Sequence, residues 1–479
     1  MTVLAFSGRD FHLDDLEKLP VPANLTTRIK QCAVDSGFDL CGIAPIGDFR
    51  ELRVFPDWIA DGRHGEMKYM EARDQAGELK REALARVAPW ARSVIVCALN
   101  YNTAHPYSIQ PHSIQPISSQ PSTQTKTHVG TDECVHVVTR KAKTETDECV
   151  RPYVIRGKVE TGENNDANND ASKSESANAS LDASRGWISR YAWGHEDYHD
   201  TVLRRLRSTE DGLRRLFADI EYGATSTGDS LQLRSYVDTG PLVERVYAKY
   251  AGIGWIGKNT CIINQQLGSW LFLGVILTSL NIRERDSTEK DVAKKDAAGN
   301  DATQSLLAES ELTADLPAPD RCGTCTRCIT ACPTQAIVAP GKLDARLCIS
   351  YLTIEKRGAI PDELRSLMGR HVFGCDICQD VCPWNRKAPV TTVPEFEPRP
   401  GMVDPSLDWL AEMEPEEFQR VFRSSPVRRA KLSGLRRNAV IAMGNSRNKK
   451  FMPTLKKLSE DPDPLVAEHA QWALAELGI

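Results

Sequence analysis

The chain has 479 residues, a formal net charge of −5 and a mean hydropathy of −0.39, which describes an ordinary soluble protein of roughly two or three domains. It contains no apolar run of about 18 or more residues, and residues 1–10 lack a basic region followed by an apolar stretch. We therefore expect neither a membrane span nor a secretory signal. The fourteen cysteines favour metal binding in a reducing cytoplasm over disulfides.

The first part of the chain predicts an α/β domain, which we place at residues 1–101 and 185–282. Residues 25–37 have helical periodicity and residues 39–44 predict a short strand. Residues 93–99 form a near-continuous apolar run, typical of a strand buried on both faces.

Composition changes at residues 102–184, where Tyr107 and Tyr153 are the only aromatic residues. Such sequence cannot bury enough apolar surface to offset the entropy of ordering, so it predicts a disordered insertion. Thr-Asp-Glu-Cys-Val occurs twice there, with Cys134 and Cys149. We interpret these cysteines as duplicated low-complexity sequence, with extra metal ligands as the alternative. A second polar insertion covers residues 283–319.

After the first insertion, the pattern predicts a helix at 201–217, the end of a strand at 235–238, a helix at 242–251 and strands at 261–263 and 270–280. Asp238 stands at the strand end beside Gly240-Pro241. A carboxyl group there can be a general acid if a buried pocket raises its pKa. A turn or helix-cap role explains Asp238 at least as well.

The segment Gly252-Ile-Gly-Trp-Ile-Gly257 resembles a dinucleotide fingerprint, but it follows a predicted helix rather than a strand. We expect its glycines to permit a tight turn or a close backbone approach instead.

The most specific signal is the cysteine spacing within a predicted two-cluster domain at residues 320–390. The runs are Cys322-x2-Cys325-x2-Cys328-x3-Cys332-Pro333 and Cys375-x2-Cys378-x3-Cys382-Pro383. This is the pattern of bacterial ferredoxins with two [4Fe-4S] clusters. Zinc also binds Cys-x2-Cys pairs, but its sites rarely use these further cysteines and the Cys-Pro ending.

The second run lacks its first cysteine, because Val372 stands three residues before Cys375, and Cys348 is the natural replacement. In two-cluster ferredoxins the last cysteine of each run ligates the other cluster. The predicted ligands are Cys322, Cys325, Cys328 and Cys382 for one cluster, and Cys332, Cys348, Cys375 and Cys378 for the other.

Residues 391–479 predict a C-terminal α-helical, HEAT-like region, with helices at 432–444 and within 451–477. From Arg423 to Lys457 there are eleven Lys and Arg residues and no Asp or Glu, and five acidic residues follow. This asymmetry favours a nucleic-acid surface, with a solvated charged face as the alternative.

These residues together closely resemble the epoxyqueuosine reductase family. The matching motifs are Ser189-Arg-Tyr-Ala-Trp-Gly194, Asp197-Tyr-His199, Val237-Asp-Thr-Gly-Pro-Leu-Val-Glu244, Ala251-Gly-Ile-Gly-Trp-Ile-Gly-Lys-Asn259, Gly268-Ser-Trp270, Cys348-Ile-Ser-Tyr-Leu-Thr353 and Gly374-Cys-Asp-Ile-Cys-Gln379, with the cysteine runs. They cover nearly the whole chain outside the two insertions.

The resemblance implies an α/β cobalamin-binding domain, and an enzyme that reduces epoxyqueuosine to queuosine in tRNA, the last step of queuosine biosynthesis. Its cofactors would be cobalamin and two [4Fe-4S] clusters, and an external donor would supply the electrons. The protein would be a cytoplasmic monomer. The proton donor falls on Asp238. The cobalamin contacts fall on Arg81, Ser189, Asp238, Ile262, Leu273, Ser350 and Asp376. Lys356, Arg357 and the basic C-terminal helices would face tRNA.

Two other functions are open at this point. A corrinoid reductive dehalogenase shares the two clusters, but it would usually carry a twin-arginine export signal, which is absent here. A non-catalytic electron-transfer protein would bind no corrinoid.

Overall fold

The computed structural model describes residues 25–104, 182–219, 231–280 and 315–478, which belong to one compact unit. Most of the two predicted insertions, with Cys134 and Cys149, lies outside these ranges. Among the described residues, no helix is both long and apolar enough to cross a membrane.

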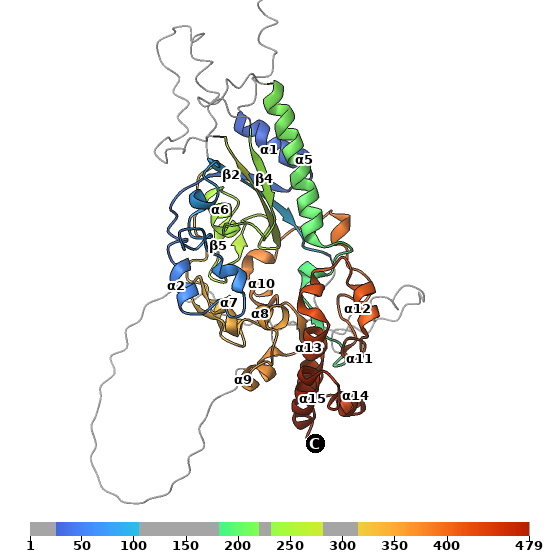
Figure 1. Cartoon of the computed structure of the whole chain (residues 1–479). Coiled ribbons are helices and arrows are strands. Elements are labelled where there is room, and N and C mark those ends of the chain that lie inside the picture. Colours follow the sequence, from blue (N-terminus) through green and yellow to red (C-terminus); the bar gives the residue numbers. More distant parts are fainter. Residues whose placement is uncertain (1–24, 105–181, 220–230, 281–314, 479) are drawn as a thin grey trace, which may run out of the picture. The chain divides into compact units, whose positions relative to one another are not determined.

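A four-stranded sheet forms the centre of the N-terminal part, in the order β1-β2-β7-β4 (Figure 1). The strands are β1 (Leu40–Pro45), β2 (Ser93–Asn100), β7 (Leu271–Thr278) and β4 (Leu233–Tyr236). Every pairing in the sheet is antiparallel. Helices cover both faces, as expected of the predicted domain, but no parallel crossover is present among these strands.

All eight residues of β2 are buried, as the apolar run predicted. Successive side chains of a strand point to opposite faces. Ile95, Cys97 and Leu99 pack in one core with α1 (Leu25–Asp35) and α5 (Tyr198–Asp219). Val94, Val96 and Ala98 pack in a second core with α6 (Glu244–Tyr250).

The glycine-rich segment after α6 forms a hairpin of β5 (Trp255–Ile256) and β6 (Ile262–Ile263). A Cβ atom on Gly254 would lie 2.4 Å from the carbonyl oxygen of Ile263. The close approach predicted for these glycines is therefore confirmed, and the segment opens no helix as a dinucleotide site would.

The cysteine-rich part consists of short elements joined by tight turns. They are α7 (Arg327–Ala331), β8 (Ile337–Ala339), β9 (Lys342–Leu343), α8 (Ile349–Ile354), α9 (Asp362–Arg365), β10 (His371–Phe373) and α10 (Ile377–Asp380). β10 pairs in parallel with β3 (Trp187–Ile188), which directly follows the first insertion. Helices α2 (Phe55–Ala60) and α3 (Leu84–Val87) lie in the N-terminal part.

The C-terminal part is helical, as predicted, with α11 (Leu407–Ala411), α12 (Pro415–Val421), α13 (Lys431–Asn445), α14 (Met452–Leu458) and α15 (Pro464–Glu476). One apolar core runs from Ile188 and Phe373 into α13 and α15. The helices therefore share a core with the β3–β10 pair.

The second insertion ends earlier than predicted. Asp315 binds Lys30 at 2.5 Å and accepts a hydrogen bond from the backbone N–H of Ile43 at 2.7 Å. These bonds attach residues from Asp315 onward to α1 and β1, so the predicted boundary at residue 319 is wrong by a few residues.

Candidate active site

Asp238 stands in a tight turn two residues beyond the end of β4. Its φ angle is +56°, and the Thr239 N–H donates to the Val237 carbonyl at 2.6 Å, which closes a three-residue turn. The helix-cap alternative is wrong, because the residue that caps α6 is Val243. A non-glycine residue in this backbone region is uncommon and often marks a functional position.

Two residues at the start of α5 face the Asp238 carboxylate. The Tyr198 hydroxyl donates to Asp238 Oδ2 at 2.5 Å, and His199 Nε2 lies 3.5 Å from the same oxygen. Asp197, just before α5, accepts from the His199 backbone N–H at 3.0 Å and from His199 Nδ1 at 2.8 Å. The N-terminus of one helix thus fixes both partners of Asp238.

The side chain of Asp238 is 46% exposed, so the buried pocket that was the condition for a general acid does not enclose this carboxyl group. Burial acts on its neighbours instead. Burial and the charge of Asp238 raise the pKa of Glu244 to about 7, and they raise the pKa of Tyr198 well above 10. Tyr198 therefore remains a hydrogen-bond donor, whereas Glu244 changes charge near neutral pH.

Three further residues, Tyr69, Glu355 and Arg429, lie near Asp238. Of these, the sequence singled out only Arg429, as part of the basic run from Arg423 to Lys457. The Arg429 guanidinium binds Glu355 at 2.6 Å and the Tyr69 hydroxyl at 3.1 Å. Arg81, a predicted cobalamin contact, donates to the Tyr69 carbonyl at 2.8 Å. Tyr69 and Arg429 belong to segments 360 residues apart, so sequence spacing could not reveal them.

Two other predicted cobalamin contacts meet in the structure. The buried Ser189 hydroxyl donates to Asp376 Oδ1, and the Arg190 N–H donates to Asp376 Oδ2 at 2.7 Å. The φ angle of Gly374 is +71°, and a Cβ atom there would lie 2.4 Å from Ser189 Cβ. Glycine therefore permits the β3 end to approach the cysteine-bearing loop.

The remaining predicted contacts occupy separate elements. Ile262 lies in β6 and is buried, Leu273 lies in β7 opposite Ala98, and Ser350 lies in the first turn of α8 beside Cys348. Leu273 and Ser350 are half-buried.

The first predicted group of cysteines shares one electrostatic environment. Burial and the nearby Cys322 and Cys325 raise the pKa of Cys328. Burial, with Cys322 and Cys328 close by, also raises the pKa of Cys382 to about 11. Cys382, 50 or more positions away in the sequence, thus lies with the first run.

The second group behaves in the same way. Burial and the neighbouring Cys348 and Cys332 raise the pKa of Cys375. A ninth thiol, Cys261 beside β6, lies close to Cys378 and raises the pKa of Cys378, and this neighbour was not anticipated from the sequence. The only sequence signal for Cys261 is that it begins the strand predicted at 261–263.

Within the described ranges, no three Cys, His, Asp or Glu side chains close around a point as the ligands of one ion would. Thiolates of a four-iron cluster bind its outer corners, so two groups of neighbouring but separated thiols fit that cofactor. The Trp255 indole N–H donates to Cys322 Sγ at 3.4 Å, as a donor to a cluster ligand would. The Trp384 ring packs edge-on against Trp255, with centroids 5.0 Å apart.

The two predicted tRNA-binding residues are engaged within the protein. Lys356 Nζ binds Glu66 at 2.5 Å, and its side chain is 24% exposed. Arg357 is exposed, and its Nη1 donates to the carbonyls of Ile354 and Arg429.

The basic C-terminal segment does not form one continuous surface. Arg437 is fully buried and donates to the carbonyls of Leu352, Lys356 and Gly358. Arg436 binds Asp461 at 2.6 Å, and Arg447 binds Glu476. The acidic residues that follow the basic run neutralise part of it in the fold, so the predicted patch is smaller than the sequence indicated.

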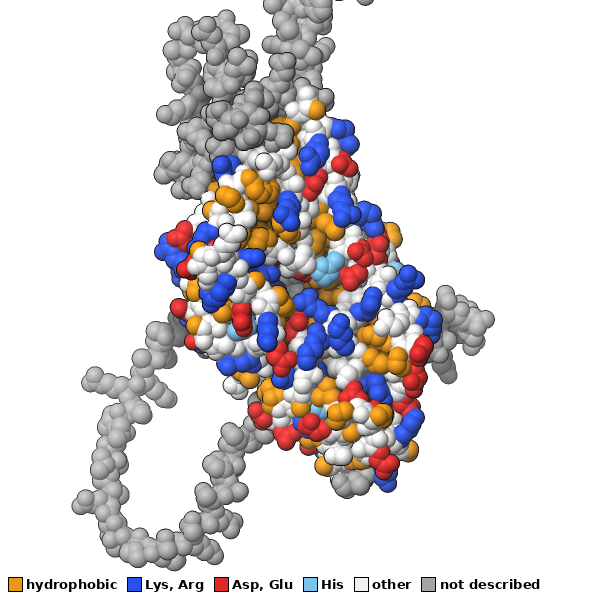
Figure 2. Space-filling view, viewed as in Figure 1, with side chains coloured by type: hydrophobic (Ala, Val, Ile, Leu, Met, Phe, Trp, Pro, Cys, Tyr) orange, Lys and Arg blue, Asp and Glu red, His pale blue; other side chains and the backbone are white. Residues whose placement is uncertain are grey.

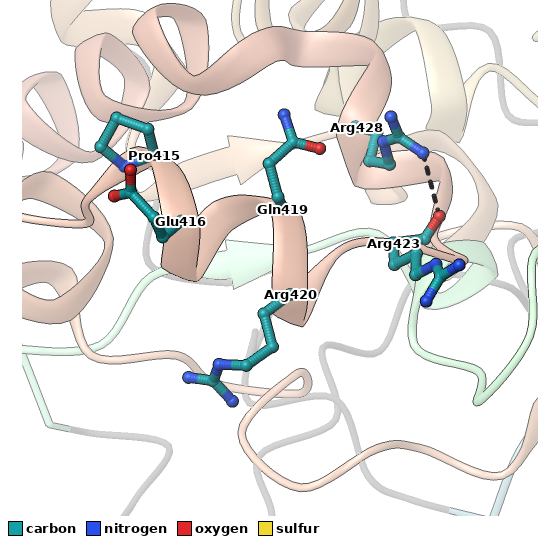
Figure 3. Close-up of a pocket in the computed structure, with 6 residues that line it drawn as sticks. All are labelled: Pro415, Glu416, Gln419, Arg420, Arg423 and Arg428. Carbon is teal, nitrogen blue, oxygen red and sulfur yellow. Dashed lines mark hydrogen bonds between the residues drawn. The ribbon is translucent and has the colours of Figure 1, made fainter.

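Exposed basic side chains do gather at α12 and the turn after it. Arg420, Arg423 and Arg428, with Pro415, Glu416 and Gln419, line an open hollow of about 740 Å³ (Figure 3). Arg428 Nη1 donates to the Arg423 carbonyl at 3.1 Å. Figure 2 shows the molecule from the same side as Figure 1. Lys and Arg side chains lie across the middle of this face, over the region of α8, α12 and α13.

Two family models match the chain. One, described as epoxyqueuosine reductase QueG, DUF1730, covers residues 166–239, and the other, a 4Fe-4S double cluster binding domain, covers residues 321–385. Epoxyqueuosine reductase of Xanthomonas campestris pv. campestris is 31% identical over 461 residues, covering 96% of this chain and 98% of the relative. That of Escherichia coli is 37% identical over 291 residues, covering 61% of this chain and 66% of the relative.

Solved structures agree with these relatives. A crystal structure of epoxyqueuosine reductase with an epoxyqueuosine-modified tRNA-Tyr stem loop aligns with a TM-score of 0.64 at 25% identity, covering 95% of this chain and 90% of that one. A selenomethionine-labelled epoxyqueuosine reductase gives the same TM-score and identity, with 95% and 91% covered.

The acid site and the double-cluster domain define an iron–sulfur oxidoreductase. More narrowly, the chain belongs to the epoxyqueuosine reductase family, since it matches a relative above 30% identity along nearly its full length.

Proposed function

We propose that the chain reduces the epoxide of epoxyqueuosine to queuosine in tRNA, as the last step of queuosine biosynthesis. The observation that carries this proposal is the exposed Asp238 carboxylate, held by Tyr198 and faced by His199, in the same compact unit as eight grouped cysteines. Reducing an epoxide to an alkene breaks two C–O bonds, releases water and consumes two electrons and two protons. The site must therefore deliver both.

The electrons would enter through two [4Fe-4S] clusters from an external low-potential donor. We assign Cys322, Cys325, Cys328 and Cys382 to one cluster and Cys332, Cys348, Cys375 and Cys378 to the other. The mutual influence of these thiols on one another's pKa supports this crossed assignment.

We propose that cobalamin binds between the acid site and the second cluster. The residues that would contact it are Arg81, Ser189, Asp238, Ile262, Leu273, Ser350 and Asp376. Among the described residues, Glu244 Oε1 is a buried acceptor with no hydrogen-bond partner, which suits an amide donor such as those on a corrin ring. When bound, cobalamin supplies a cobalt centre that can be reduced at low potential.

Asp238 would act as the proton donor to the reacting substrate. Tyr198 occupies Oδ2, so Oδ1 is the oxygen available to the substrate. The strained turn fixes the carboxyl group at the protein surface, where a flipped-out base can reach it.

We also propose the domain organisation that these roles need: a cobalamin-binding domain at 1–101 and 185–282, a two-cluster domain at 320–390, and a HEAT-like helical region at 391–479. The protein would be cytoplasmic, because its tRNA substrate and its oxygen-sensitive clusters both belong in that compartment. We propose that it is a monomer.

The tRNA would contact the hollow lined by Arg420, Arg423 and Arg428. This hollow adjoins the acid site through the 3-10 helix Pro426–Ala430, which carries Arg428 at the hollow and Arg429 beside Tyr69. Lys356 and Arg357 would contribute only after their internal bonds rearrange.

The function is tested by anaerobic purification with cobalamin, iron and cobalt quantitation, and turnover of tRNA carrying epoxyqueuosine. We expect two clusters, one corrinoid and loss of turnover in Asp238→Asn without loss of either cofactor. Iron without corrinoid uptake would favour an electron-transfer protein. Corrinoid with reduction of a halocarbon but not of the tRNA would favour a dehalogenase.

The tRNA surface is tested by replacing Arg420, Arg423 and Arg428 with Gln and measuring affinity against salt. Each lost phosphate contact should lower the slope of log Kd against log salt by roughly 0.7–0.9. Replacing Arg207 and Arg215, exposed on α5, provides the matched control. An unchanged slope in the triple variant would reject this surface.

A further inference from the structure

The reaction needs two protons per epoxide, whereas the Asp238 carboxyl group holds only one. A second proton must reach the site while the substrate is bound. This question rests on the proposed function, in which Asp238 is the proton donor.

The geometry points to His199 as the residue that returns a proton to Asp238 during each turnover. His199 Nε2 faces Asp238 Oδ2 at 3.5 Å, and its Nδ1 is held by Asp197 at 2.8 Å. This carboxylate–histidine–carboxylate line fixes the ring so that one nitrogen always points at the acid. Asp197 also caps the start of α5, so the ring cannot swing away without disturbing that helix end.

The position of His199 suits a route from solvent. A substrate bound at Asp238 would cover part of its exposed side, whereas His199 lies against the carboxylate within the protein. The His199 side chain is 30% exposed and can take up a proton there. Tyr198 cannot serve instead, because burial and the nearby Asp238 keep its pKa far above neutral.

The charges around His199 allow it to carry a proton near neutral pH. Burial lowers the pKa of His199, but the hydrogen bond and charge of Asp197 and the charge of Asp238 outweigh it, so the pKa lies above 6.5. The positive charge of Arg429 opposes them and lowers the pKa of His199.

The proton balance closes with two transfers. Asp238 first gives its proton to the epoxide-derived oxygen and becomes a carboxylate. The imidazolium of His199 then protonates Oδ2, and rotation of the carboxyl group brings this second proton to the leaving hydroxyl, which departs as water. The neutral imidazole then takes a proton from solvent, passes it to the Asp238 carboxylate and is protonated by solvent again, so that both groups regain the two protons that the turnover consumed. The two electrons come from the external donor through the clusters.

The test compares His199→Ala, Asp238→Asn and wild type in anaerobic turnover of epoxyqueuosine tRNA, with and without added imidazole. We expect His199→Ala to keep its cofactor content and tRNA affinity and to lose about 100-fold in kcat. Imidazole should restore part of the rate of His199→Ala but none of that of Asp238→Asn. The alkaline limb of the pH profile should also disappear in His199→Ala.

Two controls separate the possible failures. His195→Gln changes an exposed histidine near the same helix and should leave the rate and the pH profile unchanged. Asp197→Asn should shift the pH profile through His199 even if His199→Ala does not fold. A His199→Ala enzyme with the wild-type rate and pH profile, or one that loses activity without imidazole rescue, overturns the relay. If wild type itself does not reduce epoxyqueuosine tRNA, the proposed function fails instead.

Discussion

The Ser189 hydroxyl donates a hydrogen bond to the Asp376 carboxylate, although 187 positions separate the two residues. The bond joins the end of β3 to the segment that carries Cys375 and, in the first turn of α10, Cys378. Both residues are buried, so replacing either one removes a hydrogen bond that is shielded from water.

Ser189→Ala should lower stability and weaken corrinoid uptake. A hydrogen bond to a buried carboxylate contributes about 1.5–3 kcal/mol. Of the two partners of Asp376 described above, the variant would retain the Arg190 N–H. Urea unfolding and cobalamin titration of the full chain provide the two measurements. Ser235→Ala, which removes a similar serine bond to Glu210, should lower stability without changing cobalamin affinity. Equal cobalamin affinities for both variants would contradict the proposed contact.

Trp255→Phe should make the reduction potential of one cluster more negative. The indole N–H donates to Cys322 Sγ, and removing a donor from a cluster thiolate disfavours the reduced, more negative state. A shift of about 20–60 mV corresponds to roughly 0.5–1.4 kcal/mol for one electron. A redox titration followed by electron paramagnetic resonance measures it. Trp384→Phe, which alters the packing partner of Trp255, should shift the potential less.

Arg437→Met should destabilise the protein by about 3 kcal/mol, because three carbonyl groups of the Leu352–Gly358 segment would lose their donor inside the core. The midpoint of urea unfolding measures the loss. Arg423→Met removes an exposed guanidinium from the same basic run and should change stability little. If the two variants unfold at the same urea concentration, Arg437 has no such structural role.

His469 should make the fold less stable in acid. Burial lowers its pKa to about 4, and its Nε2 accepts from the Ile360 N–H, which requires the neutral ring. The unfolded chain, with a pKa near 6.5, binds the proton more readily. Stability from this residue is therefore complete above about pH 6.5 and falls by about 3 kcal/mol as the pH decreases to 4.

The check is urea unfolding of His469→Gln across that pH range. The variant should lack this part of the acid dependence, whereas His195→Gln should keep it. A His469→Gln protein with the full wild-type acid dependence would show that other groups are responsible.

Local pattern was enough to predict most elements of the fold. The buried run of β2 and the helix α5 follow from periodicity within a few residues. The glycines after α6 predicted a close backbone approach or a tight turn, but not the hairpin of β5 and β6. The pairing order of the sheet could not be read in this way, because β2 and β7 are separated by more than 170 residues and antiparallel and parallel strands look alike in sequence.

The residues of the candidate site also differ in whether a local sequence pattern reveals them. Cysteine spacing identified eight residues because cluster ligation imposes a local pattern. Tyr69, Arg429 and Cys261 carry no such pattern, since long-range packing alone brings them to the site. The charge of residues 423–457 predicted a larger basic surface than the fold has. Arg436 and Arg447 form ion pairs with acidic residues later in the chain, and this pairing depends on the fold rather than on local sequence.

The pairing of β3 with β10 bears on how such a protein can be rearranged in evolution or by design. β3 pairs with β10 of the cysteine-rich segment. Both strands contribute side chains to the apolar core of the C-terminal helices. A ferredoxin portion excised from this chain would lose a strand and expose Val372 and Phe373. Removing or exchanging the cysteine-rich segment alone would therefore break the β3–β10 pair and open the apolar core that this pair shares with the C-terminal helices.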